Sequence, residues 1–161
     1  MQLKNQVEWA LHCCAILAGV PGDGRLSARD LAKLHGVPKE YLSKALQTLS
    51  QAGIVEGTLG PTGGYRLARA PEKITFLNIV EAVEGEASGF VCTEIRKNNP
   101  CRPAGFCDDR PCAIARTMWA ADKAWRDSLS GTNLADLGKT LEKDIPAGLR
   151  KKTADWIAAR S

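Results

Sequence analysis

The sequence lacks the long apolar stretch that a membrane-spanning helix requires. No uninterrupted run of about 18 apolar residues occurs in the chain. Its most apolar segment, residues 7–20, is interrupted by Glu8 and His12, and no small-residue cleavage site clearly follows it. We therefore expect no membrane partner and no secretory signal, and the cytoplasm is the expected location.

Recognisable catalytic arrangements are also missing. The sequence shows no paired carboxylates placed for acid–base chemistry, no nucleophile with an accompanying base and no phosphate-binding loop. An electron carrier or metalloenzyme built on its cysteines is the alternative to a binding protein. These absences favour a protein that is not an enzyme, with no catalytic residues.

Length and charge limit the fold and the partners. A chain of 161 residues with 44% apolar content is long enough for one compact domain and one or two appended helices. Lysine and arginine outnumber aspartate and glutamate by 22 to 18, and residues 1–75 contain nine basic and six acidic side chains. This excess permits binding to DNA without establishing it, because affinity depends on where the charges lie.

Helical signals fill the first third of the chain. Apolar spacing predicts a helix over residues 3–19, and Ser27 begins a second, short helix that ends at His35-Gly36. Pro38 begins a third helix, which runs up to Gly53. Its buried stripe consists of Leu42, Ala45, Leu46 and Leu49. Two helices across a glycine-containing turn predict a helix-turn-helix, whose second helix would enter the major groove. A polar face on an ordinary bundle helix is the alternative.

A hairpin follows the third helix. Residues 54–58 and 65–69 predict two strands, joined by the glycine-rich segment 59–64. A hairpin directly after a recognition helix is a wing, to which Arg66 and Arg69 could add positive charge. The alternative is a plain hairpin that caps the core. We therefore expect a mainly α fold, a winged helix-turn-helix with a small β-hairpin wing.

The remaining chain divides into three parts after a winged helix-turn-helix domain at 1–85. That domain ends with a helix capped by Thr75 and stopped by Gly85. Residues 86–111, here called the cysteine loop, read as an unusually long loop. Residues 112–145 predict a long dimerisation helix and a following short helix capped by Thr132, while the tail at 146–161 carries no interpretation. The apolar stripe of the long helix comprises Ile114, Met118, Ala121 and Trp125. Such a stripe can pack on a second copy, which predicts a homodimer, or fold back on its own domain.

Four cysteines in and beside the cysteine loop are candidate metal ligands. Cys92, Cys101, Cys107 and Cys112 are separated by eight, five and four residues, which matches neither the CxxC spacing of ferredoxins nor a regular zinc knuckle. In a reducing compartment such cysteines are more plausible as metal ligands or redox thiols than as a disulfide framework. They could hold a cluster by themselves, hold zinc or form regulatory disulfides.

Two further pairs of residues lie on the first predicted helix. Glu8 and His12 are four residues apart and leave the same helix face, so they could bind one metal together or form an ordinary surface interaction. Cys13 and Cys14 are expected to be buried small apolar residues.

The order of these elements resembles the Rrf2 family of regulators over roughly residues 1–140. The resemblance rests on Tyr41-Leu42 in the third helix, GPTGGY at 60–65 and a cysteine loop before a long helix. VEWALHCC at 7–14, VCTEIR at 91–96 and CAIAR at 112–116 are most similar to the RsrR branch, in a group that also contains IscR and NsrR. The family implies a dimeric winged-helix transcription factor, often with an iron-sulfur cluster.

The RsrR-like pattern implies a 2Fe-2S cluster held by two cysteines of one subunit and by a glutamate and a histidine of the other. Carried over by position, these ligands are Cys92 and Cys112 with Glu8 and His12 of the partner chain. Cys101 and Cys107 remain alternative ligands, and three cysteines with an outside carboxylate would resemble the 4Fe-4S, nitric-oxide-responsive NsrR branch.

The resemblance thus implies a redox-sensing transcriptional regulator that binds a double-stranded DNA operator as a homodimer. Leu59 stands where some family wings carry an arginine, so the operator sequence is not transferable. We expect DNA contacts, chiefly to phosphates for the lysines, from Ser27, Lys39, Tyr41, Lys44, Gln47, Gly63 and Gly64.

Overall fold

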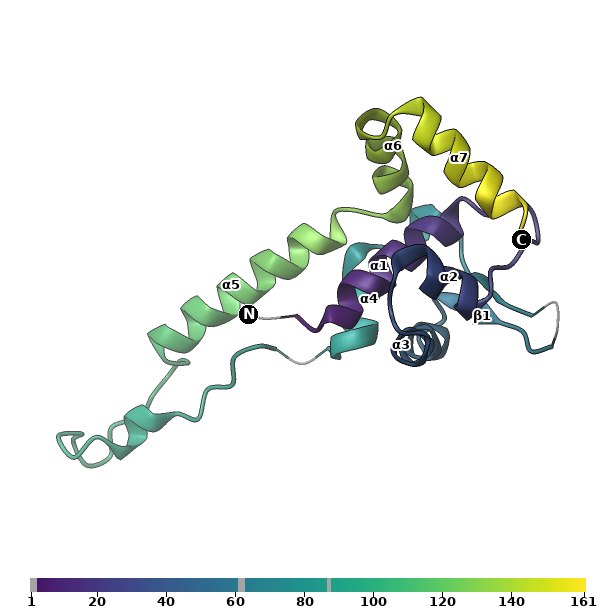
Figure 1. Cartoon of the computed structure of the whole chain (residues 1–161). Coiled ribbons are helices and arrows are strands. Elements are labelled where there is room, and N and C mark those ends of the chain that lie inside the picture. The colour runs from purple at the N-terminus through teal and green to yellow at the C-terminus, as the bar shows by residue number, and fades with distance from the viewer. Residues whose placement is uncertain (1–2, 61–62, 87) are drawn as a thin grey trace.

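Three helices form the N-terminal part of the chain in the computed structural model, which describes residues 3–60, 63–86 and 88–161. They are α1 (Asn5–Ala18), α2 (Ala28–His35) and α3 (Lys39–Gln51) (Figure 1). The Ser27 hydroxyl accepts a hydrogen bond from the Asp30 backbone N–H, and Gly36 ends α2 in the left-handed conformation at φ 64°. The predicted helix-turn-helix is therefore confirmed.

The core lies where α1, α3 and α4 (Phe76–Glu84) meet. The predicted stripe of α3, from Leu42 to Leu49, is at most 2% exposed. It packs in one cluster with Cys13 and Cys14 of α1, both fully buried. Each buried leucine contributes about 1.5–3 kcal/mol through removal of apolar surface from water, so this cluster fixes the orientation of α3.

The predicted wing is a two-stranded antiparallel hairpin of β1 (Val55–Gly57) and β2 (Tyr65–Leu67), in which Val55 lies opposite Leu67. Tyr65 also bridges to Leu26 in the loop before α2, which ties the hairpin to the helix-turn-helix. Pro61 and Thr62, in the motif that suggested the wing, lie outside the described residues.

Arg66 does not provide the free positive charge that the sequence suggested for the wing. Its Nε donates to Glu56 Oε1 at 2.6 Å, and it forms an ion pair with Asp23. Glu56 also accepts from Arg25 Nη2 at 2.8 Å. These hydrogen bonds, from Arg25 first and then from Arg66, hold the pKa of Glu56 below its usual range. This charge network joins the wing to the loop before α2.

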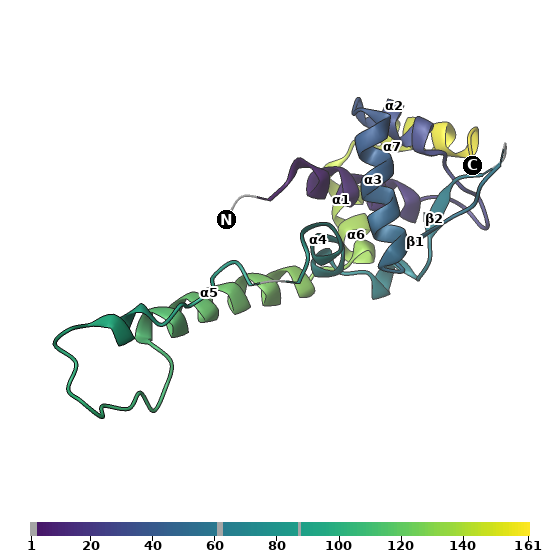
Figure 2. The same ribbon diagram turned by 90° about the horizontal axis from the view of Figure 1, so that it is seen from below.

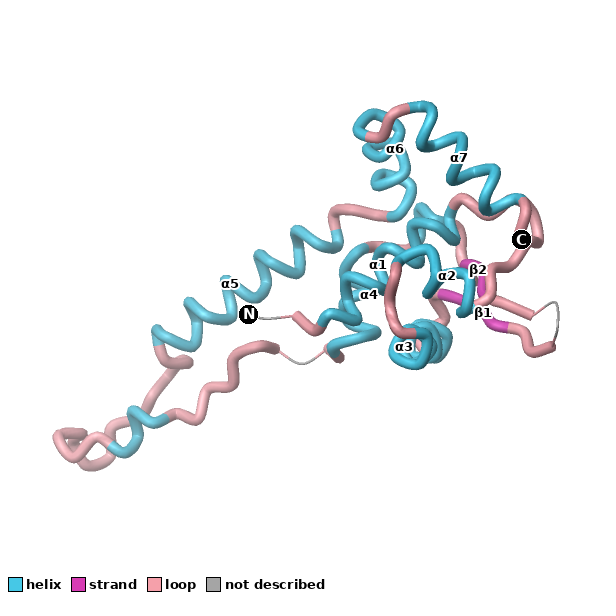
Figure 3. The backbone as a smooth tube through the Cα atoms, in the orientation of Figure 1, coloured by secondary structure: helices cyan, strands magenta, loops and turns pink. Residues whose placement is uncertain are grey.

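Beyond α4, the chain leaves the core as a long projection (Figures 1 and 2). After η1 (Pro71–Lys73), the Thr75 side chain caps α4 as predicted. The cysteine loop contains only one short helical segment, η2 (Ile95–Asn98), among its described residues (Figure 3). It leads into α5 (Ala113–Ser130), whose Arg126 pairs with Glu81 of α4 at 2.5 Å.

The last part of the chain returns to the core. Helix α6 (Leu134–Asp144) is capped by Asn133, not by Thr132 as the sequence suggested, because the Asn133 side chain accepts from the Asp136 N–H. The tail forms α7 (Ala147–Ala158), which buries Ile157 against the core cluster. Among the described residues, no helix combines the length and the apolar character needed to cross a membrane.

Gly64 generates the first prediction. A Cβ at this position would lie 2.7 Å from the backbone oxygen of Leu26, which the bridge to Tyr65 holds in place. Gly64→Ala should therefore destabilise the protein by about 1–3 kcal/mol, measured by urea denaturation. The matched control is Gly138→Ala in α6, where nothing lies within 4 Å of the added Cβ. That change should stabilise the helix by roughly 0.5–1 kcal/mol, and equal effects in both variants would contradict this interpretation.

Candidate functional site

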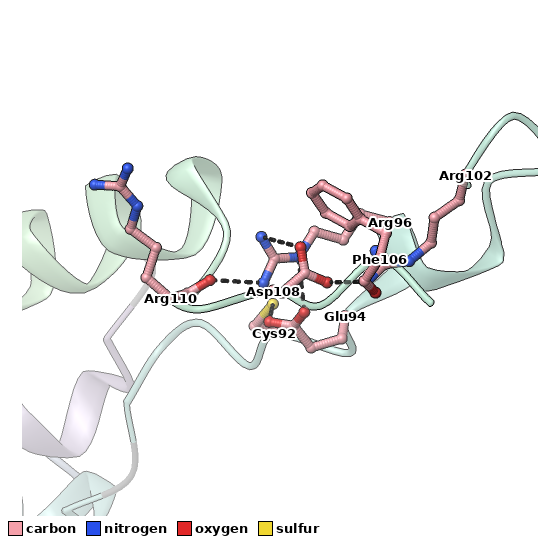
Figure 4. Close-up of polar contacts among 7 residues, drawn as sticks. All are labelled: Cys92, Glu94, Arg96, Arg102, Phe106, Asp108 and Arg110. Atoms are coloured by element: carbon pink, nitrogen blue, oxygen red, sulfur yellow. Dashed lines mark hydrogen bonds and ion pairs between the residues drawn. The ribbon is translucent and has the colours of Figure 1, made fainter. Parts of the chain in front are cut away.

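The guanidinium of Arg96 connects the neighbourhoods of Cys92 and Cys112. The Cys92 thiol donates to Glu94 Oε1 at 3.6 Å, and Glu94 Oε2 accepts from Arg96 Nε at 2.8 Å. Arg96 Nη2 donates to the backbone oxygen of Arg110 at 2.9 Å, two residues before Cys112. Cys112 is near enough to this guanidinium to raise the pKa of Arg96, after larger effects of Glu94 and Asp108. Arg96 thereby joins the start of the cysteine loop to its end (Figure 4).

Asp108 completes this arrangement, which we call the Arg96 clasp and define as Glu94, Arg96, Arg102 and Asp108. Asp108, with a side chain 12% exposed, lies 3.2 Å from Arg96 Nη1 and accepts from Arg102 Nη2 at 2.7 Å. The hydrogen bond from Arg102 is the main reason that the pKa of Asp108 lies below its usual value. Arg102 also donates to the backbone oxygen of Phe106 and stacks on its ring (Figure 4). A loop without regular structure is thus ordered by charge pairs.

The other two cysteines of the loop are more exposed. Cys101 and Cys107 are exposed, whereas Cys92 and Cys112 are half-buried. Cys107 lines a groove together with the clasp residues, and Cys101 does not. No group of three or more Cys, His, Asp or Glu residues gathers to hold a metal in the described part of the chain. In the described structure the four cysteines of the loop are therefore not gathered at one point.

Glu8 and His12 lie together on the exposed face of α1, as their spacing predicted. They line a groove of about 410 Å³ whose apolar wall includes Leu11 and Leu137. The His12 ring lies 5.7 Å from that of His35, whose Nε2 is buried without a hydrogen-bond partner among the described residues. Burial, followed by the proximity of His12, lowers the pKa of His35. A carboxylate and an imidazole are thus displayed toward solvent beside an apolar groove.

Cys13 and Cys14 are not candidate ligands. Both thiols are buried in the core, and burial raises the pKa of Cys13 to about 12 and shifts that of Cys14 in the same direction. Because the thiolate is the metal-binding form, these residues act as the small apolar core residues that the sequence predicted.

The predicted stripe of α5 is only partly covered within the chain. Ile114 is 68% exposed and Met118 42% exposed, and Ala121 is also exposed, whereas Trp125 is half-buried. The helix projects away from the core and does not fold back over it (Figures 1 and 2). An uncovered apolar helix face is typical of a surface that packs against another chain.

The residues expected to contact DNA fall into two groups. Tyr41, Lys44 and Gln47 lie on the exposed side of α3, and Lys44 Nζ lies 5.9 Å from the centre of the Tyr41 ring. Ser27, Lys39, Gly63 and Gly64 line a groove between the wing and the start of α2. For the two glycines, the structure also gives a packing reason, since a Cβ on either would collide with the neighbouring backbone.

The clasp was missed by sequence reasoning. The pairing of Arg96, Arg102 and Asp108 depends on the loop closing on itself, which local sequence patterns do not specify. The signal that could have found them is the alternation of opposite charges within a glycine- and proline-containing segment bounded by two candidate ligands.

Comparison with known proteins identifies one family. Residues 3–140 match the Rrf2 family, described as iron-dependent transcriptional regulators. A putative HTH-type transcriptional regulator of Aquifex aeolicus is 31% identical over 145 residues, covering 90% of this chain and 96% of the relative. The HTH-type transcriptional repressor NsrR of Streptomyces coelicolor is 30% identical, covering 85% of this chain and 88% of the repressor.

Solved structures show the same fold. IscR from T. potens aligns with a TM-score of 0.68 at 23% identity, covering 91% of this chain and 93% of IscR. CymR, described as the global cysteine regulator of B. subtilis, aligns with a TM-score of 0.66 at 24% identity, covering 87% of this chain and 98% of CymR.

The clasp generates the second prediction. Asp108→Asn removes the charge that pairs with Arg96 and Arg102, so amides 93–111 should exchange with deuterium roughly 5-fold faster. Asp109→Asn is the matched control, because Asp109 is exposed and forms no ion pair with another described residue. Equal exchange in both variants would show that the clasp does not order the loop.

Proposed function

This chain belongs to the Rrf2 family of transcriptional regulators, and we propose that it is a homodimeric, redox-sensing regulator whose iron-sulfur cluster controls operator binding. Within the family we assign it to the RsrR-like branch, with a 2Fe-2S cluster held by Cys92 and Cys112 of one chain and by Glu8 and His12 of the other. DNA is the expected partner, and no catalytic role is proposed.

One observation carries the proposal: the candidate ligands are divided between two places in the chain. Two half-buried thiols, Cys92 and Cys112, lie in the projection, whereas an exposed carboxylate and imidazole lie on α1. A 2Fe-2S cluster takes four protein ligands, two for each iron, and histidine replaces cysteine on one iron in some of them. The donor set fits such a cluster when two chains contribute one pair each.

The exposed apolar residues of α5 provide a surface through which two chains can dimerise. Packing Ile114, Met118 and Ala121 of one chain against the same face of another removes apolar surface from water and aligns the two projections. The Glu8 and His12 pair, beside its apolar groove, is then available to the tip of the partner's projection.

A bound 2Fe-2S cluster would supply one-electron redox chemistry. Arg96 holds a fixed positive charge near Cys112 and is joined to Cys92 through Glu94. Because the ligands come from two chains, a change at the site alters dimer geometry and hence the separation of the two α3 helices on DNA.

DNA contacts are assigned to α3 and to the groove beside the wing. Tyr41 and Gln47 are placed to reach base edges, and Lys39 and Lys44 to neutralise phosphates. Ser27 lies at the start of α2, where the helix dipole also favours a phosphate.

An NsrR-like 4Fe-4S site is the second candidate. It is favoured by the similarity to the S. coelicolor repressor and by the position of Cys107, which lines the groove of the clasp. Three cysteines with an outside carboxylate would then be the ligands. Zinc or a disulfide at the same cysteines is a further possibility, which metal and sulfide content separates from both clusters.

Cysteine variants provide the third prediction. Cys92→Ala and Cys112→Ala should each abolish the visible absorption of anaerobically purified protein, because each removes one of two thiolates. Cys101→Ala is the control and should retain absorption, iron and sulfide per chain, and operator binding. Cys107→Ala should behave like the control.

Other outcomes of the cysteine substitutions would favour a different ligand set. Loss of the cluster in Cys107→Ala as well would favour the NsrR-like site, and equal loss in all four variants would favour a loop-only site. Protein that contains zinc without inorganic sulfide would contradict the proposed cluster.

A further inference from the structure

The end of α7 lies beside the groove assigned to DNA. This helix follows the segment matched by the family, residues 3–140, and was not predicted from the sequence. Ile157, 5% exposed, packs in the core cluster, with Trp156 against its edge. This anchoring brings Arg160 to the wall of a groove of about 1140 Å³ between the wing, the loop before α2 and the start of α2. The yellow end of the chain reaches this region in Figure 1.

Arg160 is held in place and keeps donors available. Its guanidinium stacks on the Trp156 ring at 4.4 Å, and its Nη1 donates to the Trp156 backbone oxygen at 3.3 Å. Its Nε also forms a long ion pair with Asp30 Oδ1 at 3.8 Å, beyond hydrogen-bond distance. The other carboxylate oxygen, Asp30 Oδ2, accepts from the Ser27 hydroxyl at 2.6 Å. An oriented guanidinium with free N–H groups is suited to bind a phosphate.

The groove around Arg160 has an excess of usable positive charge. Arg29 and Lys39 also line it, are exposed, and form no ion pair with other described residues. Arg25 lines it too, but its guanidinium is paired with Glu56. The acidic side chains in the wall are Asp23, which is paired with Arg66, and Asp30, which forms the long ion pair with Arg160.

We propose that α7 enlarges the DNA-binding surface by placing Arg160 against a backbone phosphate of the duplex, next to the phosphates held by Arg29 and Lys39. The inference rests on the proposed DNA-binding function and adds a contact from outside the matched segment. The ligand is a phosphate of the DNA backbone, bound whatever the base sequence. Arg160 lies in the wall of the groove and not on the exposed face of α3, so it is not placed to read bases.

The test compares Arg160→Gln with Arg150→Gln, a change in the same helix at an exposed residue that does not line the groove. Binding to a DNA duplex of unrelated sequence is measured by fluorescence anisotropy at several salt concentrations. Arg160→Gln should weaken binding by roughly tenfold at low salt and reduce the slope of log Kd against log salt by about 0.9, the value for one phosphate. Arg150→Gln should match the wild type.

Arg160→Lys separates a phosphate contact from a purely structural role. Lysine keeps the charge, so the salt slope of Arg160→Lys should return to the wild-type value. If Arg160 acted only by stacking on Trp156, Arg160→Lys and Arg160→Gln would bind DNA equally weakly. Thermal melting verifies that α7 remains folded.

Lys44→Ala is the reference for the proposed function. If Lys44→Ala weakens binding and Arg160→Gln does not, DNA binding stands and the role of Arg160 is refuted. If the wild-type protein itself binds no duplex, the proposed function fails.

Discussion

The shape of the cysteine loop depends on the ion pairs and hydrogen bonds of the Arg96 guanidinium. The loop has little regular structure among its described residues, so its shape comes from ion pairs with Glu94 and Asp108 and from the hydrogen bond to the Arg110 carbonyl. Without this closure, Cys92 and Cys112 would be separated by a long flexible segment, and fixing them on a metal would cost conformational entropy. The charge pairs supply that order in advance and place the positive charge of Arg96 near Cys112.

A second constraint is that the core and the projection have different structural roles. Burial along α3 fixes the recognition helix, while α5 leaves its apolar face uncovered and carries the cysteine loop away from α1 (Figure 2). A site completed between two chains would therefore connect ligand chemistry to the relative position of two DNA-binding units. The same division explains why the clasp stabilises the loop locally while the core determines global stability.

Local signals predicted most of the fold. Ser27, Gly36, Pro38 and Thr75 mark helix ends through contacts made within a few residues, and the stripe of α3 has a clear period. Interactions between distant segments were not predictable in this way. Arg66 is neutralised by Asp23, 43 residues away, and α7 has few apolar residues beyond Trp156 and Ile157 to reveal its docking. The N-cap of α6 is Asn133 and not the adjacent Thr132. Both residue types cap helices well, so the sequence alone did not distinguish them. The pairing of Glu8 with His12 on one face was predictable from spacing, whereas the clasp was not.

The central claim is that the cluster ligands come from two chains, and mixed dimers test it most directly. One chain carries Cys92→Ala and Cys112→Ala, the other carries Glu8→Ala and His12→Ala, and differently tagged heterodimers are isolated and reconstituted anaerobically with iron and sulfide. Shared ligation predicts one intact site per heterodimer, with the wild-type absorption spectrum at half the wild-type iron content. If the heterodimer shows only the combined spectra of the two mutant homodimers, the ligands come from a single chain and the account is wrong.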